Sequence, residues 1–137
     1  MAGMLLKLAP HERVLVNGLV IENGERRAKL RIESPDASIL RLRDAIHPDD
    51  VRGPVSRAYY DAQLALAGEA DVTATTAALG PRLDELVQVF HGTSAVMPLA
   101  KARGHLDEGK LYLAMKALGP LLEIEERLLP DAEAAAA

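Results

Sequence analysis

The spacing of apolar residues changes from a period of two to a helical period near residue 48, and this change constrains the fold more than any other sequence feature. Before it, the stretches 13–16, 19–22, 25–33 and 38–43 are short and rich in Val, Ile and Leu, which is typical of strands. After it, apolar residues recur every three or four positions, as in amphipathic helices. The sequence therefore predicts the α+β class, with a small N-terminal antiparallel β-module followed by a C-terminal α-helical bundle.

Two Asn-Gly pairs and one proline-containing segment separate the expected strands. A two-residue type I′ turn needs positive φ at both central residues, which Asn and Gly tolerate. We place the main hairpin turn at Asn23-Gly24, because the strand 25–33 that follows it alternates between apolar and charged residues from Ala28 onward. Asn17-Gly18 and Ser34-Pro35-Asp36 supply the other turns, so we expect the strands to form a compact meander.

The part of the chain after residue 48 is rich in alanine and leucine and predicts a small antiparallel bundle. Pro54 suits a first helical turn and Gly68 a helix end, whereas Gly80-Pro81 is expected to kink or split the second helix. The helices are expected at residues 54–67, 72–91, 94–106 and 108–129. Three helices have a recognisable apolar stripe: Val55, Tyr59, Ala62 and Leu66 in the first, Leu79, Leu83, Leu86, Val87 and Phe90 in the second, and Leu111, Met115, Leu118, Leu122 and Leu129 in the fourth.

The same change of pattern divides the chain. We expect a β-strand module with a basic face at residues 1–47, an α-helical part at 48–130 and an Ala-rich tail at 131–137, to which we assign no function. A chain of 137 residues with 49% hydrophobic content is long enough to bury a core without covalent staples.

The absence of cysteine removes disulfides, thiolate metal sites and a cysteine nucleophile, and it fits a reducing compartment. The N-terminus lacks the charged start, long apolar run and small-residue cleavage site of a signal peptide. No apolar run approaches the ~20 residues that are needed to cross a bilayer. We therefore expect a cytoplasmic protein without a membrane partner.

No group of residues in the sequence has the spacing of a catalytic or metal site. The four histidines are scattered, and His105-x-Asp107-Glu108 lacks the i, i+4 spacing that aims two ligands at one metal from a helix. The acid pairs Asp84-Glu85 and Glu125-Glu126 occupy adjacent helix positions, which point about 100° apart, so we interpret them as solvated helix faces. The glycines are spaced for hairpin turns and not for a phosphate loop. We predict that the chain is not an enzyme and needs neither a cofactor nor a metal.

Charge is distributed unevenly along the chain. Residues 1–46 contain eight Lys or Arg and six Asp or Glu, a net charge of +2, whereas residues 47–137 contain eight and fourteen, a net charge of −6. The basic excess is concentrated in residues 26–43, where only Glu33 and Asp36 oppose Arg26, Arg27, Lys29, Arg31, Arg41 and Arg43. A phosphate backbone would prefer this half of the chain. The alternative is an ordinary solvated strand face.

Residues 12–33 resemble the FlbT family of flagellum biosynthesis repressors. The similarity is carried by Glu12-Arg13-Val14-Leu15-Val16-Asn17-Gly18 and by Val20-Ile21-Glu22-Asn23-Gly24-Glu25-Arg26-Arg27-Ala28-x-Leu30-Arg31-Ile32-Glu33. It continues more weakly through Ile39-Leu40-Arg41, Asp44-Ala45-Ile46 and Pro54-x-x-Arg57-x-Tyr59-x-x-x-Gln63. The chain departs from the family at His11, where the family usually has glycine.

This resemblance implies a post-transcriptional regulator that associates with the 5′ untranslated region of flagellin mRNA and lowers its translation or stability until flagellum assembly has progressed. Members of the family work alongside FlaF, a small flagellar partner. Some relatives activate flagellin production, so the direction of regulation stays open, as does the RNA sequence that is recognised.

A second similarity links Leu30-Arg31-Ile32-x-x-x-Pro35 and Ile39-x-x-x-Arg43-Asp44-x-Ile46 to the carbon storage regulator family of small mRNA-binding β-proteins. It implies that Arg43 contacts unpaired bases and that Lys7 of the first strand lies beside it, although Leu8 and Ala9 stand where that family usually has arginine. Lys29, Arg31 and Arg41 would then hold phosphates. The RNA-binding residues that we predict are Arg43, Arg41, Arg31, Lys29, Arg26, Arg27 and Lys7.

Aromatic residues are scarce, and none lies in the β-half, so base stacking offers little affinity there. Tyr59 is expected to be a core residue and Tyr60 its half-exposed neighbour. We therefore expect a homodimer formed through the β-strands, because two linked contacts raise apparent affinity. The alternative function is a helical adaptor or chaperone that holds flagellin or FlaF in an apolar groove and acts on mRNA indirectly.

Overall fold

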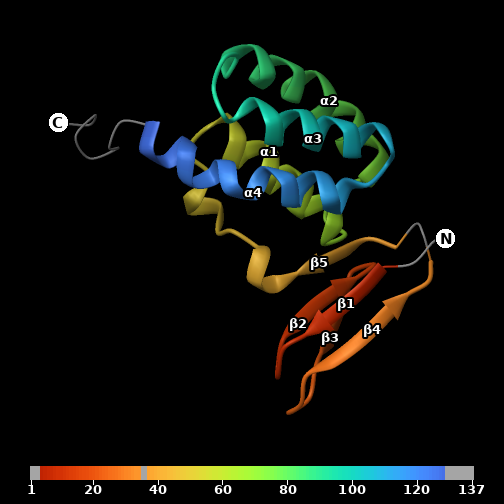
Figure 1. Ribbon diagram of the computed structural model, residues 1–137. Coiled ribbons are helices and arrows are strands. Elements are labelled where there is room, and N and C mark those ends of the chain that lie inside the picture. The colour runs from red at the N-terminus through yellow and green to blue at the C-terminus, as the bar shows by residue number, and fades with distance from the viewer. Residues whose placement is uncertain (1–3, 35–36, 129–137) are drawn as a thin grey trace.

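A computed structural model describes residues 4–34 and 37–128, and it has the expected α+β architecture. Figure 1 shows the strands on one side of the molecule and the helices on the other, with β5 running between them. The strands are β1 (Met4–Leu8), β2 (Arg13–Val16), β3 (Leu19–Glu22), β4 (Ala28–Ile32) and β5 (Ile39–Arg41). Two 3₁₀ turns follow, η1 (Leu42–Asp44) and η2 (Pro48–Asp50), and then the helices α1 (Pro54–Leu66), α2 (Val72–Val89), α3 (Val96–Asp107) and α4 (Leu111–Leu128).

The strands form two small antiparallel sheets and not the meander that we expected. One sheet pairs β1 with β4, and the other has the order β3-β2-β5. The prediction failed because it omitted β1, whose pairing with β4 separates β4 from β3. Pairing between strands that are distant in the sequence therefore determines the topology here.

The hairpin turn lies at Asn17-Gly18, and its prediction at Asn23-Gly24 was wrong. Asn17 and Gly18 both have positive φ, 52° and 80°, and they connect the paired residues Val16 and Leu19. Neither residue of the Asn23-Gly24 pair has positive φ. The Asn23 side chain instead donates from Nδ2 to the carbonyl oxygens of Ala9 and Arg26, at 2.9 and 2.8 Å. Both Asn-Gly pairs satisfy the local rule, so local chemistry alone does not choose between them.

The three-stranded sheet lies between the two-stranded sheet and the helices. Successive strand residues point to opposite faces, so Val14 packs with Leu6 and Leu8 of β1 while its neighbour Leu15 packs against the helical core. In β5, Ile39 belongs to the core between the sheets and Leu40 to the helical core. The β-module is thus attached to the bundle by buried apolar contacts.

The bundle has the core that its apolar pattern predicts. Tyr59 is buried and Tyr60 half-buried, as expected. Gly68 has a φ of +86° just after α1, which a glycine adopts without strain. Pro81 lies inside α2, which continues through it and is not split, because Leu79 and Leu83 on either side are fully packed in the core.

Glu125 of α4 caps the N-terminus of α1, so its prediction as part of a solvated face was wrong. Its carboxylate is buried and accepts backbone hydrogen bonds from Val55 at 2.6 Å and Ser56 at 3.0 Å. A carboxylate is favourable there because the first N–H groups of a helix lack partners and its N-terminal end is positive. The neighbouring Glu126 forms an ion pair with Arg52 at the surface.

Several expectations fall partly or wholly outside the described residues: the Pro35-Asp36 turn, the buried position of Leu129 and the tail 131–137. The division into parts at residues 47 and 48 stays a prediction. Among the described helices, none combines the length and the apolar character that a membrane crossing requires.

Candidate nucleic-acid interface

A hollow of about 840 Å³ lies where the end of β1, the start of β4 and the β5–η1 connection meet. We call it the basic hollow, and it is lined by Lys7, Leu8, Ala9, Arg27, Ala28, Lys29, Arg41 and Arg43. Five of the seven residues predicted to bind RNA therefore line one site, although they come from three separate segments of the chain. Arg26 and Arg31 do not line it.

Lys7 and Lys29 form the rim of the hollow on the two-stranded sheet. They are paired directly across β1 and β4, and both side chains are exposed. Like charges at opposite positions of an antiparallel pair repel each other, so an anion between them would relieve the repulsion. Arg31 lies two residues along β4 on the same exposed face and extends the positive surface away from the hollow.

Within the described residues, no ion pair involves Lys7, Arg27 or Lys29. These three side chains are exposed, and they reach the same hollow. Their charge is therefore free to attract an anionic ligand.

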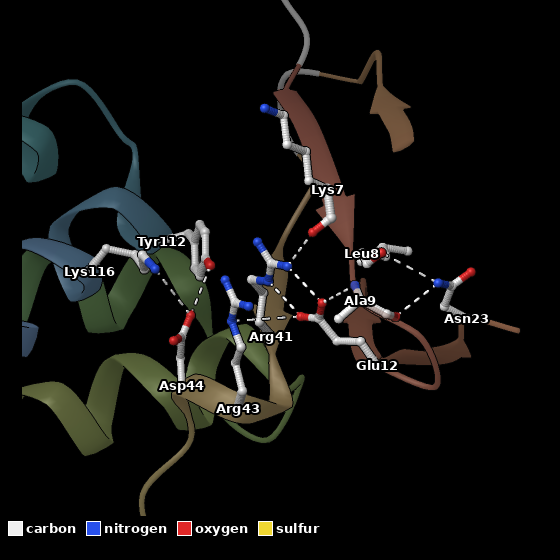
Figure 2. Close-up of polar contacts among 10 residues, drawn as sticks. All are labelled: Lys7, Leu8, Ala9, Glu12, Asn23, Arg41, Arg43, Asp44, Tyr112 and Lys116. Carbon is white, nitrogen blue, oxygen red and sulfur yellow. Dashed lines mark hydrogen bonds and ion pairs between the residues drawn. The ribbon is translucent and has the colours of Figure 1, made fainter. Parts of the chain in front are cut away.

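Arg41 lines the hollow, but its guanidinium is engaged in the structure. Its Nε and Nη2 atoms donate to the two carboxylate oxygens of Glu12 at 2.7 and 2.8 Å, and Nη2 also donates to the carbonyl oxygen of Lys7 at 2.5 Å. Figure 2 shows this fork connecting β5 to the end of β1 and to the loop that follows it. The predicted exposed side of β5, with Arg41 pointing into solvent, was wrong, because β5 is buried on both faces.

The Glu12 carboxylate remains ionised down to acidic pH. The hydrogen bond from Arg41 lowers the pKa of Glu12 from 4.5 to about 2, and the backbone N–H of Ala9 contributes to the shift. The same hydrogen bond raises the pKa of Arg41 above its ordinary value. Because each charge neutralises the other, this pair supplies geometry more than net charge.

Arg43 lies in η1, one residue beyond the end that the sequence predicted for a strand face. Its side chain is exposed, with Nε 3.8 Å from the Glu12 carboxylate, which is a weak ion pair at most. Figure 2 shows Arg41 and Arg43 side by side next to Glu12. Of the two arginines, Arg43 is the one that remains free to contact a ligand.

Asp44, the residue after Arg43, attaches η1 to the helices. Its carboxylate accepts a hydrogen bond from the Tyr112 hydroxyl at 3.1 Å and lies 3.4 Å from Lys116 Nζ, both on α4 (Figure 2). Its carbonyl oxygen accepts a hydrogen bond from the hydroxyl of Tyr59 on α1. These contacts hold Arg43 at the edge of the hollow.

Burial raises the pKa of both tyrosines, to about 12 for Tyr59 and further for Tyr112. Both hydroxyls therefore stay protonated and continue to donate to Asp44 at any physiological pH. The attachment of η1 does not depend on a titrating group near neutrality.

The sequence did not identify Glu12, Asp44 or Tyr112 as part of this site. Glu12 is separated from Arg41 by 29 positions, so no local motif joins them. A signal was nevertheless present, since Glu12 is the first acidic residue of a basic segment and Asp44 follows Arg43 directly. The described residues contain no group of three or more His, Cys, Asp or Glu side chains placed to hold a metal ion.

Comparison with known proteins gives a consistent family. The family model of the flagellar protein FlbT matches residues 4–129. The flagellum biosynthesis repressor protein FlbT of Caulobacter vibrioides is 27% identical over 90% of this chain and 87% of its own length. Probable repressors of this name from Bradyrhizobium diazoefficiens and Rhodopseudomonas palustris are 29% and 30% identical, over 96% and 90% of this chain and 88% and 95% of their own lengths. No solved structure matches the chain.

Proposed function

Since this chain belongs to the FlbT family of flagellar proteins, we propose that it is a regulator of flagellum biosynthesis that binds the 5′ untranslated region of flagellin mRNA. Binding would repress translation or shorten the lifetime of the message and so couple flagellin production to assembly. The observation that supports this proposal is the basic hollow, which collects Lys7, Arg27, Lys29 and Arg43 around one buried ion pair.

The residues of the hollow suit different parts of an RNA strand. Lys7, Arg27 and Lys29 are exposed and unpaired within the described chain, so they match phosphate oxygens. Arg43 has a planar fork of donors and suits the edge of an unpaired base. Arg41 is assigned the separate task of holding the hollow open through Glu12.

The charge distribution favours binding in one orientation. The helical part carries the net negative charge of the chain, which repels a phosphate backbone, whereas the exposed cations of β1 and β4 attract it. RNA would therefore approach the side of the molecule that the two-stranded sheet covers.

Direct binding to a flagellin 5′ leader RNA over a salt series tests this function. The variants Lys29→Glu and Arg43→Glu should each weaken binding by roughly tenfold or more, and the slope of log K against log salt should be about −2 for three phosphate contacts. Lys101→Glu is the matched control, because Lys101 is an exposed cation on α3, away from the hollow. Arg41 is unsuitable for this test, because its substitution would also disturb the fold.

Two outcomes would contradict RNA binding by the hollow. One is that Lys29→Glu and Arg43→Glu bind as well as Lys101→Glu. The other is that the purified protein binds no leader RNA until FlaF or flagellin is added. The second result would favour the adaptor function, for which the exposed Val89 and Met97 at the adjoining ends of α2 and α3 offer apolar contacts.

A further inference from the structure

Strand β3 has a free edge with unusual exposure. Leu19 is 66% exposed and Val20 59% exposed, and these neighbours point to opposite faces of the sheet. In the described chain, β3 pairs only with β2 and ends the sheet order β3-β2-β5. The strand is therefore uncovered on both faces and along one edge.

The hairpin register identifies which backbone groups point outward. The two-residue turn makes Val16 and Leu19 a hydrogen-bonded pair, and such pairs alternate along an antiparallel ladder. Asn23 N–H donates to the carbonyl oxygen of Glu12 at 2.9 Å, which agrees with this alternation. The N–H and C=O groups of Val20 and Glu22 therefore face away from β2.

The other strand edges of the β-module are less suited to pairing. Arg41 occupies the carbonyl oxygen of Lys7 on β1, and Asn23 occupies that of Ala9 just beyond it. Strand β4 carries Lys29 and Arg31, which would repel their copies in a second molecule. Strand β5 is buried throughout.

β3 carries no uncompensated charge that would oppose pairing with itself. Its one charged residue, Glu22, is paired with Arg13 on β2 at 2.8 Å. The strand also lacks the lysine or proline with which natural proteins commonly protect an exposed edge. Charge thus distinguishes β3 from the cationic β4.

We propose that β3 pairs with β3 of a second copy of this chain, antiparallel about a two-fold axis. Ile21 then lies opposite Ile21 of the partner subunit, and Val20 exchanges backbone hydrogen bonds with Glu22 of the partner subunit. Pairing of outward N–H and C=O groups gives the affinity, and cover of Leu19 and Val20 adds apolar burial. A contact of this length is small, so the dimer is weak and forms with increasing concentration.

The dimer carries two basic hollows, one on each copy. This consequence for RNA rests on the proposed function, since two linked sites raise the apparent affinity for a long leader. The assembly itself does not, because β3 does not line the hollow. Measurement of the dimer without RNA therefore separates the two proposals.

Sedimentation velocity from low to high micromolar concentration tests the dimer. The wild-type mass should rise from 14.7 kDa toward twice that value as the concentration increases. Val20→Glu places a carboxylate opposite Glu22 of the partner subunit, and Val20→Pro removes an outward N–H while leaving the pairing with β2 intact. Each should lower the association constant at least tenfold.

Leu5→Glu is the matched control. Leu5 is an aliphatic residue of similar exposure, 50%, on the outer face of β1, so its substitution should leave the association constant unchanged. The proposal is wrong if the wild-type protein stays at 14.7 kDa throughout, or if the Val20 variants associate as the wild type does. Circular dichroism of each variant confirms that the comparison is made between folded proteins.

Discussion

At the scale of single residues, Glu12 determines the geometry of the basic hollow. Its carboxylate holds Arg41 against β1 and lies beside Arg43. In the unfolded chain this carboxyl has a pKa near 4.5, and in the folded protein its pKa is about 2. The stabilisation from this shift is therefore complete above pH 4.5 and is lost as the pH falls toward 2.

We predict that Glu12→Gln lowers the free energy of unfolding at pH 7 by about 2 kcal/mol, the amount that corresponds to such a shift. Urea denaturation of both proteins at pH 7 and at pH 3 measures the effect. The difference between them should shrink at pH 3, because the wild-type protein then gains less from ionisation. An equal difference at both pH values would show that the ion pair contributes nothing.

His11 occupies a backbone conformation that favours glycine. Its φ is 60°, in the left-handed region, where the Cβ of an L-residue is strained. We predict that His11→Gly is more stable than His11→Ala by about 1 kcal/mol, because the two variants lose the same imidazole and differ in that strain. Urea midpoints of the two variants measure the difference, and a midpoint for alanine at or above that for glycine would contradict it.

At the scale of elements, the helices could be predicted and the sheet topology could not. The helical period and the punctuation by Pro54 and Gly68 are local signals, and they gave all four helices. Strand pairing depends on partners far along the sequence, so β1 was missed and its pairing with β4 with it. The predicted basic residues were placed together by that same pairing, which explains why their common hollow was not visible in the sequence.

The cap between α4 and α1 makes a prediction that separates two adjacent glutamates. Glu125→Ala should cost roughly 2–4 kcal/mol, because it leaves two buried N–H groups without acceptors. Glu126→Ala removes only an exposed ion pair and should cost less than about 1 kcal/mol. Thermal unfolding of both variants makes the comparison, and equal losses would contradict the capping role.

Gly53 should tolerate no side chain for the same reason. A Cβ at this position would lie 2.5 Å from the Cδ atom of Glu125, which is closer than real contacts allow. Gly53→Ala should therefore displace the capping carboxylate and destabilise the protein when Glu125 is present. In the Glu125→Ala background, the same substitution should cost much less, and additive costs would show that the two sites are independent.

At the scale of the whole molecule, the β-module and the bundle share buried contacts and polar anchors. Leu40 packs in the helical core, whereas its neighbour Ile39 packs between the two sheets. Asp44 is bonded to both α1 and α4. The division of the chain at residue 47 is therefore a boundary between patterns that the tertiary contacts cross.

We predict that these contacts make unfolding cooperative across that boundary. Ile39→Ala removes packing only from the core between the sheets, and the loss for such a residue is about 2–5 kcal/mol. If the parts unfold together, this substitution lowers hydrogen-exchange protection in the amides of α1 and α4 as well as in the strands. If the bundle is independent, α1 and α4 keep their wild-type protection while only β1, β2 and β5 lose theirs. Since Leu40→Ala acts directly on the helical core, it shows the protection loss that a disturbed bundle gives, and the Ile39 variant is judged against it.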